Sequence, residues 1–279
     1  MYMSDRRRIL VPHTAQPITY ADSPTSSLTS SSQKIYLRTS LLPDASGSAY
    51  FEHQQHKILV LVNGPKPQRG SFSSSAKLLV DVKFLPVSSD AHVLGIQQGL
   101  GFETDLEKSL AEFVYTSLVP AIRLGQYPKS GINVSIVVIS GPPESKALVK
   151  QVAAACVTTA GAAIVDAGIE VLDVVTACAV KISTKGDISV DFDYEQESKA
   201  SARAVISSMS SRDEITGFWI DEETEAASIE GEILTQVLQV ASAGAIDVRK
   251  LVNSVLYRSL DGLESKGKNG KRSADSISD

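Results

Sequence analysis

The chain has 279 residues, 43% of them hydrophobic, and a formal net charge of −5. This charge excludes a strongly basic nucleic-acid-binding coat, so any RNA contact must come from a local patch of cations. The length suffices for one large hydrophobic core or two small ones. No apolar run looks long enough to cross a bilayer, and we expect no membrane partner. Cys156 and Cys178 lie among small apolar residues, which favours buried free thiols over a disulfide.

Composition predicts three regions along the chain. Residues 1–33 are expected to form a partly disordered arm, because DRRR and a Ser/Thr/Pro-rich stretch offer too few apolar residues to fold alone. Residues 34–260 are expected to form a single folded domain. Residues 261–279 are polar and rich in Lys, Ser and Gly, and we expect a disordered tail there.

The first half of the body is predicted to contain five strands and one helix. Alternating or continuous β-branched and aromatic residues predict strands over residues 35–40, 47–52, 57–63, 77–84 and 132–139. The helix follows Thr104, with Glu107 placed to complete a capping box. His53 and His56 fall in the turn between the second and third strands, where we expect solvated side chains and no metal site.

The second half repeats this order. An Ala-rich helix is predicted over residues 144–165, and its small side chains would allow very close packing against a neighbour. Strands are predicted over residues 171–180, 187–192, 203–209 and 214–219, and a long amphipathic helix over residues 223–260. Because strands and helices come in blocks, the sequence predicts an α+β fold with helices packed on mixed or antiparallel sheets.

Two local clusters are candidate sites. The loop GPKPQRG over residues 64–70 carries Lys66 and Arg69, which could contact an RNA backbone or be ordinary solvated charges. The loop lacks the Lys-Ser/Thr of a phosphate-binding loop. A group of acidic residues near a strand end could hold Mg²⁺, act as a general acid, or simply be solvated. Its members are Asp187, Asp191, Asp193, Glu195 and Glu197.

Taken in order, the motifs of the body resemble those of the RNase PH superfamily. They are GSAYFEHQQHKILVLVNGP, DVKF, YPKSGINVSIVVI, AACVTTAGAAIVDAGIEVLDVVTAC, KGDISVDFDYEQE and EITGFW. The opening DRRR, the GPKPQRGSFSSS loop and LGQYPKSGI are most similar to one branch. That branch holds the non-catalytic RNase PH-like ring subunits of the eukaryotic RNA exosome, named for mRNA transport.

The resemblance implies a fold, an assembly and a cellular role. The fold is two βαβα-type halves related by a pseudo-two-fold axis, similar to domain 2 of ribosomal protein S5. The assembly is a hetero-oligomer of RNase PH-like exosome subunits in a six-membered ring around an RNA channel, with S1/KH cap proteins and an associated hydrolytic exoribonuclease. The role is rRNA processing and RNA degradation in the nucleus, nucleolus and cytoplasm, without a cofactor.

The resemblance also implies a degenerate catalytic site. The phosphate-binding Gly-Thr-Arg of active members falls on Gln151, Val152 and Ala153, so the guanidinium and the hydroxyl donor are missing. The acidic pair of active members matches Asp191 and Glu197, which by themselves would not hold a phosphate.

The segment before the first helix departs from active relatives as well. Where these relatives carry arginines that bind RNA, this chain has Glu103, Thr104 and Asp105, and the negative charge of this segment would repel a phosphodiester. The resemblance therefore implies a non-catalytic subunit that assembles the ring and guides RNA through it. The alternative is an active phosphorolytic 3′-to-5′ exoribonuclease that uses Asp191 and Glu197 with an unrecognised phosphate site.

Overall fold

The computed structural model describes residues 35–53, 56–85, 105–140, 149–183, 187–190, 200–222 and 231–275. The chain divides into two compact units, Met1–Gln33 and Lys34–Asp279, and all of the described residues lie in the second unit. The expected arm, residues 1–33, therefore lies outside the described residues.

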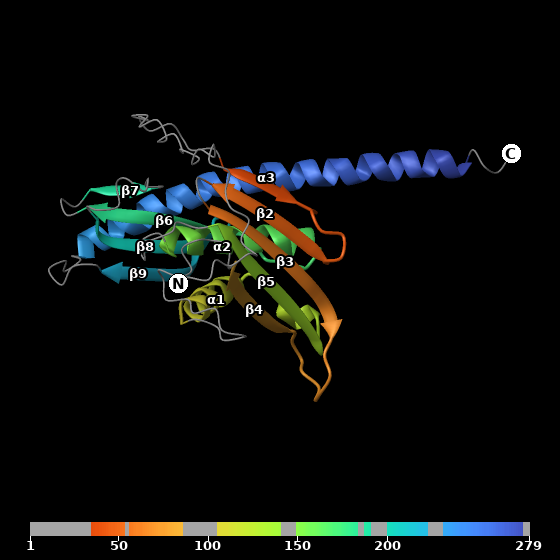
Figure 1. Cartoon of the computed structure of the whole chain (residues 1–279), viewed down its shortest axis with the longest axis horizontal. Coiled ribbons are helices and arrows are strands. Elements are labelled where there is room, and N and C mark those ends of the chain that lie inside the picture. The colour runs from red at the N-terminus through yellow and green to blue at the C-terminus, as the bar shows by residue number, and fades with distance from the viewer. Residues whose placement is uncertain are drawn as a thin grey trace, which may run out of the picture. The chain divides into compact units, whose positions relative to one another are not determined.

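The first sheet has five strands in the order β1-β2-β3-β5-β4 (Figure 1). The strands are β1 (Tyr36–Thr39), β2 (Gly47–His53), β3 (His56–Pro67), β4 (Lys77–Phe84) and β5 (Ser130–Ser140). All neighbouring strands are antiparallel except β4 and β5, which are parallel. The sheet is therefore mixed, as the sequence predicts.

The end of β3 differs from the prediction. We expected the strand to end before Gly64 and Pro65, but β3 continues through them to Pro67. The pairing with β5 is irregular between Asn63 and Lys66, so Pro65 sits where no regular ladder bond is required of it. The predicted RNA-binding loop is thus partly strand, and Lys66 belongs to the sheet.

The second sheet has four antiparallel strands in the order β7-β6-β8-β9. The strands are β6 (Val175–Ser183), β7 (Ile188–Val190), β8 (Ala200–Met209) and β9 (Glu214–Glu222). All four occur where the sequence predicts strands, with bounds that differ by a few residues.

The helices lie between and beside the sheets. Helices α1 (Asp105–Leu118) and α2 (Val149–Asp166) pack between the two sheets, and α3 (Gly231–Asp275) covers the other face of the second sheet (Figure 1). A short 3-10 helix, η1 (Leu124–Gln126), leads into β5. This layering of sheet, helices, sheet and helix confirms the predicted α+β fold with helices on mixed and antiparallel sheets.

Helix α2 is the centre of the core. It contacts β2 and β3 on one side and β6 and β8 on the other, which explains its run of small side chains. By length and composition alone it could cross a membrane, but 83% of it is buried inside the fold, as in a core helix. Both cysteines are buried free thiols, as predicted, with Cys156 on α2 and Cys178 on β6.

Close packing of α2 yields a testable prediction. A Cβ added to Gly161 would lie 2.6 Å from the carbonyl oxygen of Val175, a backbone atom of β6 that cannot swing away. Gly161→Ala should therefore destabilise the fold by about 1–3 kcal/mol, although alanine favours helix formation by about 1 kcal/mol over glycine. Urea unfolding measures the change.

Gly125→Ala is the matched control. A Cβ at Gly125, in η1, would meet no atom within 4 Å, so its unfolding curve should overlay that of the wild type. A Gly161→Ala protein as stable as the wild type would contradict the close approach of α2 and β6.

The C-terminal region corrects a prediction. We expected a disordered tail from residue 261, but α3 continues to Asp275 and extends beyond the two sheets (Figure 1). Residues 261–275 contain no proline, and their Leu, Glu, Lys, Arg and Ala favour a helix, whereas Gly262, Gly267 and Gly270 disfavour it. Extending an existing helix is also far easier than nucleating one, because each added residue gains a hydrogen bond.

Candidate functional site

Gln151, Val152 and Ala153, the positions that we expect to match the phosphate-binding motif of active relatives, are buried on α2. The side chains of Val152 and Ala153 are 3% and 0% exposed and belong to the main hydrophobic core. Gln151 is also buried, and its Oε1 accepts a hydrogen bond from His56 Nε2 (2.9 Å). These three side chains pack inside the fold and offer no cation to an anion.

The other residues of the matched site are only partly described. Asp191 and Glu197 lie outside the described residues, as do Glu103 and Thr104. Asp105 is exposed at the start of α1 and lies 3.9 Å from Lys108.

The lysine that precedes the matched motif is held inside the protein. Lys150 is 1% exposed, and its Nζ lies 2.7 Å from Asp221 Oδ2 and 3.0 Å from the centre of the Trp219 ring. Trp219 Nε1 donates to the same carboxylate, at Oδ1 (3.1 Å). Burial lowers the pKa of Lys150 to about 8, against the opposing effect of Asp221. The ammonium therefore serves an internal contact between α2 and β9.

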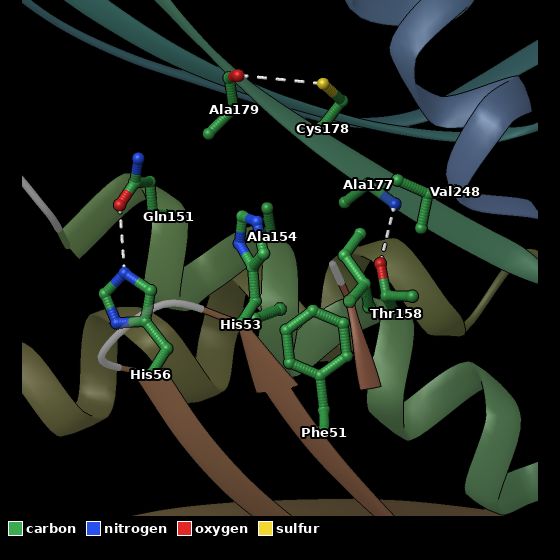
Figure 2. Close-up of a pocket in the computed structure, with 12 residues that line it drawn as sticks. Phe51, His53, His56, Gln151, Ala154, Thr158, Ala177, Cys178, Ala179 and Val248 are labelled. Atoms are coloured by element: carbon green, nitrogen blue, oxygen red, sulfur yellow. Dashed lines mark hydrogen bonds between the residues drawn. The ribbon is translucent and has the colours of Figure 1, made fainter. Parts of the chain in front are cut away.

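The two turn histidines are buried, which corrects the prediction that they are solvated. His53 and His56 are 7% and 2% exposed and face each other in the register of the β2–β3 hairpin. The end of the hairpin lies against α2, where Ala154 and Ala155 leave room for the two imidazoles (Figure 2). Pattern alone missed this, because only the packing of α2 closes the hairpin end to solvent.

A small cavity lies beside the histidines. Its volume is about 30 Å³, roughly the space of two water molecules and too small for an organic ligand. Thr158 and Cys178 also line it (Figure 2). Among the residues that the structure describes, no group of three His, Cys, Asp or Glu side chains could hold a metal ion.

The buried His56 predicts an acid-sensitive fold. Burial lowers its pKa, the bond to Gln151 opposes this, and nearby His53 lowers it further. The unfolded chain therefore takes up a proton first, so stability is complete above pH 6.5 and falls as the pH drops toward the folded pKa. Urea unfolding at a series of pH values should show this fall in the wild type and a flatter profile in His56→Gln. Equal profiles for both proteins would contradict it.

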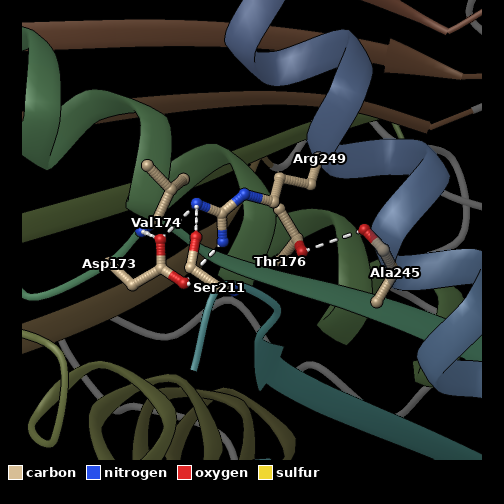
Figure 3. A network of polar contacts seen from close by, with 6 residues as sticks. All are labelled: Asp173, Val174, Thr176, Ser211, Ala245 and Arg249. Atoms are coloured by element: carbon tan, nitrogen blue, oxygen red, sulfur yellow. Dashed lines mark hydrogen bonds and ion pairs between the residues drawn. The ribbon is translucent and has the colours of Figure 1, made fainter. Parts of the chain in front are cut away.

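A second polar network attaches α3 to the second sheet (Figure 3). Arg249 on α3 forms a bidentate ion pair with Asp173, just before β6, and also donates to Ser211 Oγ (2.6 Å). The Ser211 and Val174 N–H groups donate to the same carboxylate at 2.9 and 2.8 Å. Both carboxylate oxygens of Asp173 thus accept hydrogen bonds within the chain, which indicates a structural role.

The tip of the first sheet carries the predicted cations. Lys66 and Arg69 are exposed, and Lys66 lies beside Gly131 of β5. Lys77, at the start of β4, lies beside Gly131 from the other side. Lys129, just before β5, is exposed at the same end. None of these four cations forms an ion pair with a residue in the described part of the chain.

Sequence reasoning missed Lys77 and Lys129 as members of this tip. A signal was present, because residues 63–80 and 124–140 contain no Asp or Glu although the chain is acidic overall. What the sequence does not reveal is that β5 inserts between β3 and β4 and so brings the two segments together.

Comparisons with known proteins agree with the fold. A family model described as the 3′ exoribonuclease family, domain 1 (RNase PH), matches residues 31–170. The chain is 31% identical over 264 residues to "Exosome complex component mtr3" of Schizosaccharomyces pombe, covering 91% of this chain and 96% of that protein. It is 29% identical over 262 residues to "Exosome complex component MTR3" of Chaetomium thermophilum, covering 82% and 90% of the two chains.

A solved structure has the same fold. The crystal structure of rice (Oryza sativa) Rrp46 matches with a TM-score of 0.66 and 17% identity, covering 81% of this chain and 95% of that chain. The family model matches half of this chain, and the similarity to the fission yeast protein extends over nearly the whole chain. The chain therefore belongs to the RNase PH family of 3′ exoribonucleases.

Proposed function

We propose that this chain is a non-catalytic structural subunit of the RNA exosome core ring. The observation that carries the proposal is the similarity to Exosome complex component mtr3 along nearly the full length of both chains. In this role the chain assembles with other RNase PH-like subunits into a six-membered ring and supports 3′-to-5′ RNA processing and degradation, including rRNA maturation. S1/KH cap proteins and a hydrolytic exoribonuclease bind the ring, in the nucleus, nucleolus and cytoplasm.

The environment of α2 supports the absence of activity. Phosphorolysis requires inorganic phosphate held in line with the terminal phosphodiester. Val152 and Ala153 are buried and carry no cation or hydroxyl, and Lys150 is engaged with Asp221 and Trp219. Loss of a charge-assisted anchor for phosphate costs on the order of a thousandfold in rate or more.

Co-purification tests the assembly. The tagged full chain, isolated from its native source, should bring down five other RNase PH-like chains together with S1/KH proteins. A chain that is recovered alone under conditions that preserve the exosome would refute the proposal.

A nucleotide-release assay tests the chemistry. The chain, alone and in its ring, is incubated with RNA and inorganic phosphate, and we expect no nucleoside diphosphate above background. The Asp191→Asn ring should degrade RNA at the wild-type rate. Phosphate-dependent release of nucleoside diphosphates that disappears in Asp191→Asn would establish the alternative, an active phosphorolytic exoribonuclease.

Lys66 and Arg69 are proposed to guide RNA. Their exposure and their freedom from ion pairs within the described part of the chain support this role. The double substitution Lys66→Glu, Arg69→Glu should weaken RNA threading through the assembled ring, measured by nuclease protection, without changing assembly. Unchanged protection would make them ordinary solvated charges.

A further inference from the structure

The segment between β3 and β4 exposes an aromatic ring to solvent. Phe72 is 76% exposed, more than any other large hydrophobic residue in the described part of the chain. A single exposed apolar side chain is common on protein surfaces and by itself proves nothing. What distinguishes Phe72 is its surroundings.

Those surroundings are cationic, and the two segments that form this tip, residues 63–80 and 124–140, contain no Asp or Glu. Glu170, whose backbone N–H donates to Tyr127, is paired with Arg123. In one row across the outer face of the sheet, Lys66 and Lys77 flank Gly131, which has no side chain. Neighbouring strands are about 5 Å apart, so the two lysines start about 10 Å apart with an open notch between them. A Cβ at Gly131 would meet no atom closer than 4.0 Å. Such a notch suits a phosphate group that two ammonium groups approach from opposite sides.

Three backbone hydrogen bonds join the segment that carries Phe72 to residues 124–129 of the same chain. The Gln68 N–H donates to the Lys129 carbonyl oxygen (3.0 Å), and the Lys129 N–H donates to that of Ser73 (2.9 Å). The Ala76 N–H donates to the Leu124 carbonyl oxygen (2.9 Å). These bonds fix the backbone next to Phe72 against that of Lys129, so little backbone order must be gained on binding.

We propose that Phe72 is a stacking platform for a base of single-stranded RNA, with Lys66, Lys77 and Lys129 contacting the flanking phosphates. An aromatic ring among cations is the usual arrangement for sequence-tolerant binding of single strands, because every base has a flat face. The absence of acidic residues from segments 63–80 and 124–140 favours RNA over a protein partner, whose surface would carry both charges. The inference deepens the proposed guiding role and depends on it for the identity of the ligand.

The test separates stacking from charge. Full-length protein and the assembled ring are titrated with fluorescent oligouridine and with a base-free ribose-phosphate oligomer of the same length. Phe72→Ala should weaken oligouridine binding about fivefold or more and leave binding of the base-free oligomer unchanged. Phe72→Trp should keep the affinity. Tyr257→Ala removes an aromatic side chain of similar exposure (69%) on α3 and should change neither affinity.

The lysines are tested through salt dependence. The double substitution Lys66→Gln, Lys77→Gln should weaken the binding of both oligomers. It should also reduce the slope of log affinity against log salt concentration by about 0.7 for each cation removed. Phe72→Ala should leave that slope unchanged, because a stacking contact releases no counterions.

Each outcome has one meaning. The stacking role would be overturned if Phe72→Ala bound both oligomers with equally reduced affinity, or bound both with the wild-type affinity. Failure of Phe72→Ala to join the ring, with oligouridine binding intact, would make Phe72 a protein contact instead. Loss of oligouridine binding by Phe72→Ala in a chain that joins no exosome ring would uphold this inference and refute the proposed function.

Discussion

Replacing Asp173 by alanine is expected to lower the free energy of unfolding by about 3–5 kcal/mol, the cost of leaving the other half of a buried ion pair uncompensated. Asp173 is 8% exposed, and the Arg249 side chain that pairs with it is 15% exposed. The substitution also removes the acceptor of the Ser211 and Val174 N–H groups. Helix α3 would thereby lose its ion pair with the residue that precedes β6.

Chemical denaturation of matched variants measures this effect. Glu214→Ala breaks an exposed ion pair with Arg212, whose Nε–Oε2 distance is 3.1 Å, and should leave stability nearly unchanged. Combining Asp173→Ala with Arg249→Met should recover part of the loss, because no buried charge then remains unpaired. An Asp173→Ala protein as stable as Glu214→Ala would show that the network does not anchor α3.

The same network predicts a loss of stability in acid. Burial opposes ionisation of Asp173, but the hydrogen bonds from Arg249, Ser211 and Val174 hold its pKa below the ordinary value of 3.8. The stabilising effect is therefore complete above that value and is lost as the pH falls through the folded pKa. Asp173→Ala should lack this part of the acid transition.

Lys150→Met is expected to remove a rise in stability at alkaline pH. The folded pKa of Lys150 is about 8, below its ordinary value of 10.5, so between these values the unfolded chain holds a proton that the folded chain has released. Stability should then increase with pH across this window, by up to about 3 kcal/mol. The Trp219 ring stabilises the ammonium, which makes the actual increase smaller.

The comparison is made by urea unfolding at a series of pH values from neutral to alkaline. Because other groups titrate equally in both proteins, the difference between wild type and Lys150→Met isolates this lysine. Below pH 8 the variant should be at least as stable as the wild type, since methionine fills the buried site without a charge and Asp221, 54% exposed, can be solvated. Lys108→Met, at a side chain 58% exposed, should follow the wild-type profile. Parallel profiles for Lys150→Met and wild type would contradict the assigned environment.

Much of the fold can be predicted from the sequence because the signals are local. Strand β4 begins and ends where its alternating residues predict, from Lys77 to Phe84. The Ala-rich composition of α2 indicates close packing, and the two sheets on either side of it explain why. The order of the motifs suffices to recognise the RNase PH family, which the comparisons show independently.

The sites depend on neighbours that the sequence does not reveal. Lys66 and Lys77 flank one glycine only because β5 inserts between β3 and β4. Likewise, Lys150 meets Asp221, and the histidines at the end of a hairpin become buried, only when α2 packs between the sheets. Periodicity determines which face of a strand or helix is apolar, because that depends on residues a few positions apart. Strand order and the pairing of distant charges are decided by how those faces cover one another, and therefore by the tertiary structure alone.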